Sequence, residues 1–184
     1  MIEEEYLYPE IYFSKEAAYN YEHSARMRSV QRELTERAIE LLELGSGNLL
    51  DVGCGTGFSM QVAQEFGFRV IGMDISEPML EIAKQKGLEV KQGNMTSLPF
   101  PDDYFDAIIS ISTLQWVSGK SYEDIIDNYN KVGKEFYRVL RKKARAVIQF
   151  YPKTKEQLDI AAKAFKRAGF TVTIAVDYPD SPRK

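Results

Sequence analysis

The chain has 184 residues, of which 44% are hydrophobic and 28% charged, as in ordinary soluble domains. This length suits a single domain with a sizeable core, which we expect to span residues 1–184. The only cysteine, Cys54, excludes an internal disulfide and a cysteine-rich metal site, and we expect no bound metal. No apolar run is long enough to span a membrane, and the acidic start does not resemble a signal peptide, so a cytoplasmic protein is expected.

The net charge of −3 is unevenly distributed along the chain. Residues 1–119 carry a net −10, and residues 120–184 a net +7. Such asymmetry can mark a nucleic-acid face, but solvated helix faces in one interleaved domain explain it equally well, and we favour that interpretation. Contact with phosphates is a hypothesis for one basic group, which comprises Lys131, Lys134, Arg138, Arg141, Lys142, Lys143 and Arg145.

The first 47 residues predict an N-terminal arm followed by helical structure. Residues 1–13 are acidic and aromatic, and we expect them to pack as an irregular arm. From Ser14 the pattern is helical, and Gly45 and Gly47 close it. Apolar residues recur there at steps of three and four, typical of an amphipathic helix, at Met27, Val30, Leu34, Ala38 and Leu41.

Residues 48–176 alternate between predicted strands and helices. Ser76, Ser121 and Thr154 are predicted helix caps, and the last two have capping-box partners three residues on, Asp124 and Gln157. This alternation predicts an α/β fold, a doubly wound, mostly parallel Rossmann-like sheet with helices on both faces. The expected strands are 49–52, 69–73, 88–92, 105–111, 144–150 and 170–176, and the expected helices are 58–66, 77–86, 122–140 and 155–168.

The predicted strand Leu49–Val52 ends in a glycine-rich turn, Gly53-x-Gly55-x-Gly57, and a helical pattern follows at once. Glycine lets a backbone turn sharply and approach a ligand closely, and a following helix N-terminus presents unpaired N–H groups. The turn therefore predicts a nucleotide-like ligand at the carboxyl edge of the sheet. A merely tight strand-to-helix turn is the alternative. Phe58, at the sixth position, argues against the dinucleotide fingerprint of NAD and FAD proteins.

Two further features favour a ligand. Asp74 closes the next predicted strand 17 residues after Gly57, where an acid can accept hydrogen bonds from both ribose hydroxyls. Asn94 and Met95 follow the third predicted strand. Together with Asp51 before the glycines, this arrangement resembles motif I and the neighbouring motifs of class I S-adenosylmethionine-dependent methyltransferases, so the expected cofactor is S-adenosylmethionine.

Other stretches resemble a narrower family, the small-subunit ribosomal RNA guanine-N7 methyltransferases of eukaryotes and archaea. The resemblance covers nearly the whole chain from Phe13. Asn94 stands where that family commonly has aspartate, and Ala25 where it has serine. The stretches that carry the resemblance are Tyr21 and Ser24-Ala25-Arg26-Met27 with Gln31, Ser110-Ile111-Ser112-Thr113-Leu114-Gln115-Trp116, Gln149-Phe150-Tyr151-Pro152, Gly169-Phe170, and Val176-Asp177-Tyr178-Pro179.

The resemblance implies a set of cofactor-binding residues. The three glycines would pass beneath the cofactor, and Asp51 would order the loop near its amino group or merely stabilise the turn. Asp74 would hold the ribose, beside Ile75, while Asn94 and Met95 would frame the adenine. Tyr21 and Arg26 would lie over the site, Arg26 meeting the cofactor carboxylate, although a surface ion pair and a packed ring are alternatives. The complete set is Tyr21, Arg26, Asp51, Gly53, Gly55, Gly57, Asp74, Ile75, Asn94, Met95 and Ser110.

The resemblance also implies a substrate side. Ser110 ends the fourth predicted strand, and Gln115 and Trp116 follow in a loop, where an amide and an indole suit a purine. Guanine N7 carries a free lone pair, so no general base is needed, and the lone histidine, His23, is more simply a surface or packing residue. We therefore expect Ser110, Gln115 and Trp116 to act by positioning.

The resemblance further implies a final antiparallel strand beside the fifth, but the sequence stops where that strand should begin. Either the sequence is truncated, or the sheet ends without it and the fifth strand is expected to keep an incompletely paired edge. It implies two partners, ribosomal RNA or the small ribosomal subunit, and a small zinc-binding activator protein at the edge strand 88–92. A methyltransferase acting on small molecules and a non-catalytic ribosome-assembly factor with a cofactor-binding fold are the alternatives.

Overall fold

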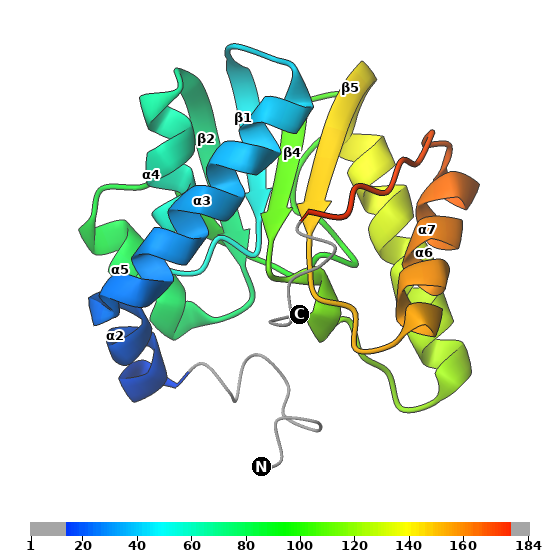
Figure 1. Cartoon of the computed structure of the whole chain (residues 1–184), viewed down its shortest axis with the longest axis horizontal. Coiled ribbons are helices and arrows are strands. Elements are labelled where there is room, and N and C mark those ends of the chain that lie inside the picture. Colours follow the sequence, from blue (N-terminus) through cyan, green and yellow to red (C-terminus); the bar gives the residue numbers. More distant parts are fainter. Residues whose placement is uncertain (1–13, 178–184) are drawn as a thin grey trace.

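A computed structural model of the chain describes residues 14–177, which form a five-stranded parallel sheet with helices on both faces (Figure 1). The expectations for residues 1–13 and for Tyr178-Pro179 lie outside this part. The strands are β1 (Gly47–Val52), β2 (Phe68–Asp74), β3 (Val90–Gln92), β4 (Phe105–Ile111) and β5 (Leu140–Gln149). The helices are α2 (Lys15–His23), α3 (Ala25–Leu42), α4 (Phe58–Glu65), α5 (Glu77–Gln85), η1 (Leu114–Trp116, a 3-10 helix), α6 (Tyr122–Val139) and α7 (Lys155–Ala168).

The two faces of the sheet carry separate hydrophobic clusters because successive strand side chains point to opposite sides. Leu49 of β1 joins the cluster covered by α3, α4 and α5, and Leu50 joins the one covered by α6 and α7. Both side chains are fully buried. Strands buried on both faces read as continuous apolar runs, which explains the sequence pattern of β1 and confirms the predicted doubly wound α/β class.

The strand order β3-β2-β1-β4-β5 places β1 in the centre of the sheet. The chain moves outward from β1 to β2 and β3, and then crosses back to β4 on the other side of β1. In such sheets the order reverses at a switch point, where the carboxyl ends of the two strands leave a crevice for ligands. The ends of β1, β2 and β4 therefore define the edge at which the predicted site residues should gather.

Helix caps decide how the N-terminal segment folds. The continuous helical pattern after Ser14 is divided into α2 and α3 by Ser24, whose hydroxyl accepts a hydrogen bond from the Met27 backbone N–H. The capping box of Ser121 and Asp124 is complete, as predicted. The second box, after Thr154, is only half formed because the partner amide accepts from the N–H of Lys153 instead of the cap residue.

The predicted strand 170–176 is wrong, because residues 171–176 are not in a strand. Phe170 and Val172 pack against the α6–α7 side of the core, whereas Ile174 and Val176 are 52% and 62% exposed. Alternating apolar residues set which side chains are buried, but a strand also needs a neighbouring strand for its hydrogen bonds. Among residues 14–177 no strand pairs with this segment, which runs toward α3 and ends in a 3.4 Å ion pair between Asp177 and Arg37.

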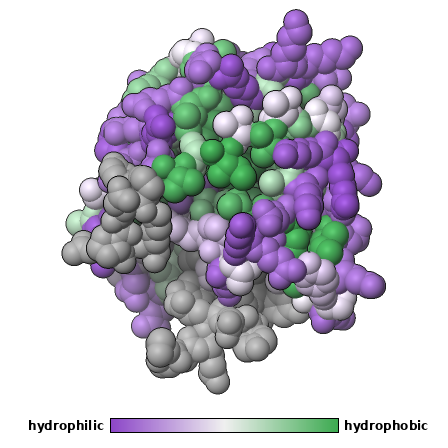
Figure 2. Space-filling model, turned by 45° about the vertical axis from the view of Figure 1, so that its right-hand side comes forward, coloured by the Kyte–Doolittle hydropathy of each residue, from purple (hydrophilic) through white to green (hydrophobic). Residues whose placement is uncertain are grey.

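The fifth strand is the edge of the sheet within residues 14–177, as expected. It begins at Leu140, four residues before the predicted start. The pairing with β4 contains an irregularity in this part, and Lys143 adopts a left-handed conformation (φ 68°), so the first residues of β5 do not follow a regular strand pattern. Figure 2 turns this side of the molecule forward and shows a hydrophobic area surrounded by hydrophilic side chains. Among the helices of the described part, none is long and apolar enough to cross a membrane.

Candidate active site

The three glycines after β1 each adopt positive φ, of 81°, 54° and 89° at Gly53, Gly55 and Gly57. A Cβ at Gly53 would collide with the side chain of Thr113, and one at Gly57 with that of Leu88. At Gly55, by contrast, no heavy atom of the described chain lies within 4 Å of the position of a Cβ. The first and third glycines therefore serve packing, whereas the middle one borders open space in which a ligand can lie.

This difference gives a test of the ligand position. We expect Gly55→Ala to weaken S-adenosylhomocysteine binding by at least about tenfold, because its methyl group enters the open space that the ligand would occupy. A tenfold loss is about 1.4 kcal/mol, as much as one hydrogen bond between ligand and protein contributes. Gly67→Ala is the matched control. Gly67 also has positive φ (91°), and the nearest atom to a Cβ added there is the Gly45 carbonyl oxygen, at an ordinary contact distance of 3.7 Å. Both variants should lose similar stability, of about 1–2 kcal/mol, by denaturant unfolding. Equal affinities in the two variants would place the ligand elsewhere.

The carboxylate of Asp74, at the end of β2, is tied to the glycine turn. Its Oδ2 accepts a hydrogen bond from the Gly55 N–H at 2.8 Å, and its Oδ1 accepts one from the Ser76 N–H at 2.9 Å. Burial raises the pKa of this half-buried carboxyl, and the backbone donors partly offset that rise. Because a carboxylate oxygen can accept a second hydrogen bond, the group can still receive ribose hydroxyls.

Asp51 of β1 is fully buried beneath the turn. Its Oδ2 accepts a short hydrogen bond from the Ser59 hydroxyl, but its Oδ1 finds no partner among residues 14–177. The hydroxyl of Thr56, in the turn itself, is also buried without a partner there. Burial raises the pKa of Asp51 to about 7, with a further contribution from the nearby Asp74. Unsatisfied buried polar atoms are rare, so these two atoms fit a ligand that brings a donor, such as an ammonium group.

The N-terminal helices place a tyrosine near both carboxylates. The ring centroid of Tyr21, on α2, lies 5.6 Å from that of Phe58 at the start of α4. Burial, followed by the charges of Asp51 and Asp74, raises the pKa of the Tyr21 phenol. Arg26 is exposed on the first turn of α3. The predicted tyrosine therefore lies beside the predicted acids, whereas Arg26 is exposed five residues after Tyr21 in the chain.

The residues expected to frame adenine lie at the ends of β2 and β3. Asn94 is exposed, and its side-chain oxygen accepts hydrogen bonds from the backbone N–H and hydroxyl of Thr96, which leaves its amide N–H groups for a ligand. Met95 is half-buried against the core. The carbonyl of Ile75 accepts a hydrogen bond from the Gln92 side chain at 3.2 Å. These contacts hold the loop in place around Asn94.

On the substrate side, Ser110 is fully buried, and its hydroxyl donates to the Val52 carbonyl at 2.8 Å, which joins β4 to β1. Ser112, two residues on, adopts left-handed φ (55°), and both its N–H and its hydroxyl donate to the Gln149 side-chain oxygen at 3.0 Å. Left-handed non-glycine residues are costly and cluster at functional sites. After this strained turn, Thr113 lies against Gly53 at the end of β1, and the η1 helix follows.

The η1 helix carries Gln115 and Trp116. The Gln115 amide N–H donates to the Ser112 carbonyl at 2.8 Å, and its oxygen is buried with no partner among the described residues. Beneath it, the hydroxyl of the fully buried Tyr129 donates to the Leu114 carbonyl at 3.1 Å and accepts from the Gln157 amide at 3.0 Å. Sequence reasoning missed Tyr129 and predicted Gln157 only as a capping-box partner; the two residues support the loop from α6 and α7.

The basic group near the start of β5 lies toward the amino ends of the strands, whereas Ser110, Gln115 and Trp116 lie at or beyond the carboxyl end of β4. Four of its members already pair with carboxylates: Lys131 with Asp127, Arg138 with Glu135 and Asp102, Arg141 with Asp106, and Arg145 with Glu43. A phosphate bound there would have to displace these pairs. Contact with phosphates through this group stays a hypothesis.

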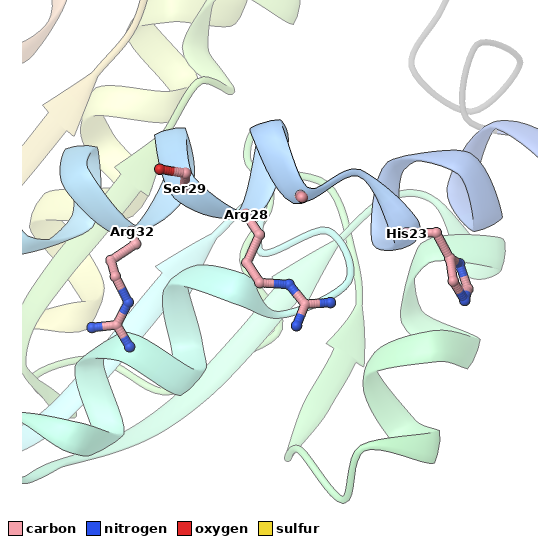
Figure 3. Close-up of a pocket in the computed structure, with 5 residues that line it drawn as sticks. His23, Arg28, Ser29 and Arg32 are labelled. Carbon is pink, nitrogen blue, oxygen red and sulfur yellow. The ribbon is translucent and has the colours of Figure 1, made fainter.

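A separate pocket of about 410 Å³ opens beside α3 and the end of α2, lined by His23, Ala25, Arg28, Ser29 and Arg32 (Figure 3). Its charges are compensated, because Arg32 pairs with both Glu36 and Glu65, and Arg28 lies 4.0 Å from Glu22. None of the predicted cofactor residues lines it. The glycine turn, and not this pocket, is therefore the candidate active site.

Comparison with known proteins identifies the class of this site. The family model described as a methyltransferase domain matches residues 50–148. In solved structures, the chain resembles a putative S-adenosylmethionine-dependent methyltransferase of Methanococcus maripaludis, with a TM-score of 0.63 and 22% identity over 91% of this chain and 75% of that one. It also resembles the putative methyltransferase solved in a complex with the Haloferax volcanii Trm112 methyltransferase activator, with a TM-score of 0.61 and 17% identity over 83% of this chain and 75% of that one. The protein is a class I S-adenosylmethionine-dependent methyltransferase.

Curated relatives narrow the class to one family. The chain is 35% identical to the 18S rRNA (guanine-N7)-methyltransferase bud23 of Schizosaccharomyces pombe, over 96% of this chain and 68% of that protein. It is 37% identical to the 18S rRNA (guanine(1575)-N7)-methyltransferase of Saccharomyces cerevisiae, over 97% and 67%. The chain belongs to the family of 18S rRNA (guanine-N7)-methyltransferases, as the sequence resemblance predicted, and spans about two thirds of the length of these relatives.

Proposed function

We propose that this methyltransferase transfers the methyl group of S-adenosylmethionine to N7 of a guanine in small-subunit ribosomal RNA. The names of the relatives support this substrate. The observation that carries the proposal is that the carboxyl ends of β1, β2 and β4 meet at one edge of the sheet, and that the buried oxygens Oδ1 of Asp51 and Oε1 of Gln115 have no partner among the described residues. The proposal treats residues 1–184 as one methyltransferase domain that acts in the cytoplasm, where a small subunit would be its partner.

The residues present fit the cofactor. The backbone at Gly55 borders the open space, Asp74 would accept the ribose hydroxyls, and the free oxygen of Asp51 would accept the ammonium group. Asn94 would meet the adenine edge, and Arg26 the cofactor carboxylate. The cofactor supplies an electrophilic methyl on a sulfonium.

The residues around η1 would then position the acceptor. Guanine N7 attacks with its own lone pair, so no proton has to leave first, and the absence of a general base from the predicted set is consistent with this chemistry. The buried oxygen of Gln115 can accept a hydrogen bond from a guanine edge N–H, and the indole of Trp116 can stack on the purine. Ser110 would hold β4 against β1 beneath them. Orientation of this kind can contribute about 7–11 kcal/mol at best.

Incubation with labelled S-adenosylmethionine and purified small ribosomal subunits tests the proposal. We expect label in the ribosomal RNA, and much less with Trp116→Ala, because stacking on one base contributes about 1–3 kcal/mol. The variant should bind the cofactor normally. Label that appears only in a small-molecule extract would favour a metabolite methyltransferase, and cofactor binding without transfer would favour a non-catalytic assembly factor.

We also propose that a small zinc-binding activator docks at β3. The bonds from the Gly72 N–H to the Glu89 carbonyl and from the Gly93 N–H to the Asp74 carbonyl face β2. Because backbone groups alternate in direction along a strand, those of Val90 and Gln92 face outward and can pair with an added strand. An adjoining groove of about 270 Å³ offers apolar contacts, lined by Ile71, Glu89, Val90, Lys91, Pro99, Phe100, Pro101 and Tyr104. The similarity to a methyltransferase solved with Trm112 supports this partner.

Val90→Pro tests this docking. Proline removes one outward N–H group but leaves the ladder between β2 and β3 intact, so the variant should fold and bind cofactor normally. We expect its affinity for a Trm112-type protein to fall at least about fivefold, measured by calorimetry, since one hydrogen bond contributes about 1 kcal/mol. The exposed Lys120→Ala, distant from β3 in the chain, serves as a control. Unchanged affinity of the proline variant would exclude strand addition at this edge.

A further inference from the structure

Lys86, the residue that ends α5, connects three parts of the molecule. Its ammonium Nζ lies 3.1 Å from both carboxylate oxygens of Glu22, on α2, and 2.9 Å from the carbonyl oxygen of Thr56, in the glycine turn. It also lies 4.6 Å from the ring centroid of Phe58, which begins α4. An ammonium has three N–H donors, so these contacts use its full hydrogen-bonding capacity.

The ion pair between Lys86 and Glu22 is well shielded from solvent. The two side chains are only 18% and 15% exposed. A second ion pair joins the same two helices, between Lys15 and Glu81, but its side chains are 81% and 47% exposed and its atoms lie 3.6 Å apart. Exposed pairs contribute little, whereas loss of one partner from a shielded pair leaves an uncompensated charge. Of the two pairs, the one at Lys86 is therefore the stronger connection between α2 and α5.

Both partners of Lys86 lead directly to the cofactor site. Glu22 is the neighbour of Tyr21, whose phenol lies near Asp51 and Asp74. Thr56 stands between Gly55, which borders the open space, and Gly57. A shift of the ammonium would therefore release the N-terminal helix on one side and the turn on the other.

The Phe58 ring strengthens this junction. Arg28 reaches from α3 (Figure 3), and its guanidinium carbon lies 5.3 Å from the centroid of the Phe58 ring. Two cations and the Tyr21 ring thus contact one aromatic side chain. A cation is attracted to an aromatic ring more strongly in shielded surroundings than in water, which applies to Lys86, 18% exposed, and much less to Arg28, 65% exposed. The start of α4, next to the glycine turn, is thereby fixed from α2, α3 and α5 together.

We propose that Lys86 is a positioning residue for the cofactor site: its ammonium holds α2 against the glycine turn, so that the turn and Tyr21 are ordered before the cofactor enters. The inference rests on the proposed placement of the cofactor at Gly55. It predicts a specific loss, in which cofactor affinity falls while the reaction of the bound cofactor is little changed.

Lys86→Met tests the proposal, because methionine retains much of the chain length but lacks the charge and the donors. We expect the dissociation constant of S-adenosylhomocysteine to rise at least about tenfold, and the Michaelis constant for S-adenosylmethionine to rise with kcat changed less than about threefold. Amide hydrogen exchange should become faster in residues 15–23 and at Gly55–Gly57. Lys86→Arg, which keeps the charge, should restore part of the affinity.

Lys15→Met is the matched control, since it breaks the exposed ion pair between the same helices and should change none of these quantities. Glu22→Gln should reproduce part of the loss, and the double variant with Lys86→Met should lose less than the sum of both. If Lys86→Met binds cofactor as the wild type does while Asp74→Ala does not, the role of Lys86 is excluded but the site stands. If neither variant loses affinity, the placement of the cofactor is wrong as well.

Discussion

Replacing Asp74 with alanine is expected to weaken binding of S-adenosylmethionine and S-adenosylhomocysteine by at least about a hundredfold. The variant loses the acceptor for the ribose hydroxyls, and also the acceptor for the N–H groups of Gly55 and Ser76, which shape the turn. Each hydrogen bond to a charged group contributes about 1.5–3 kcal/mol, so two of them suffice for this loss. Isothermal titration calorimetry measures it directly.

A matched control separates this effect from a general loss of charge. Asp102 has a side chain that is 72% exposed, pairs with Arg138 and lies just before the start of β4, whereas the glycine turn follows the end of β1. Asp102→Ala should bind both ligands with the affinity of the wild type. Equal affinities for the Asp74 and Asp102 variants would contradict the assignment of the ribose to β2.

Replacing Asp51 with asparagine is expected to stabilise the fold above neutral pH. The pKa of Asp51 is about 7 in the folded chain, mainly because of burial, whereas an aspartate in an unfolded chain has a pKa near ~3.9. Between these values the folded chain holds a proton that the unfolded chain has released. Stability therefore falls as pH rises through this window, by up to roughly 4 kcal/mol at pH 8. Asparagine cannot ionise, so it removes this loss.

Urea unfolding of the wild type and of Asp51→Asn at pH 5, 6, 7 and 8 measures the difference. The variant should already be more stable than the wild type at pH 5, by about 1.5 kcal/mol, and the difference should grow to about 4 kcal/mol near pH 7 and level off above it. Asp102→Asn serves as the control, since an exposed carboxylate should leave the wild-type curve unchanged. Curves that stay parallel for the wild type and the Asp51 variant would show that this carboxyl ionises normally in the folded chain.

Much of the fold could be predicted from the sequence because it depends on short-range patterns. Three examples are the apolar run of β1, the glycine turn and the Ser121 capping box. Each is formed by residues only a few positions apart in the sequence, and the structure has each in its expected place. The bounds of β4 were predicted to the residue, 105–111. Local chemistry determines these elements, so one chain without relatives is enough to find them.

The parts that could not be predicted depend on distant partners. Residues 170–176 have the alternation of a strand, but no neighbouring strand among the described residues accepts them. Lys86 contacts Glu22, which is 64 residues away, and Tyr129 contacts Gln157, which is 28 residues away. The sequence marks Gln157 only as a capping-box partner and does not mark Lys86 or Tyr129, because a pattern within one segment cannot reveal a contact that only the folded topology creates.

The central claim is that this site moves a methyl group to N7 of guanine in small-subunit ribosomal RNA. The most direct measurement treats small subunits with the protein and S-adenosylmethionine, then reduces the RNA with borohydride and cleaves it with aniline, which breaks the chain at N7-methylguanosine. We expect a new cleavage at a guanosine with the wild type and none with Asp74→Ala. Methyl incorporation without cleavage, or cleavage that is equal in both proteins, would contradict it.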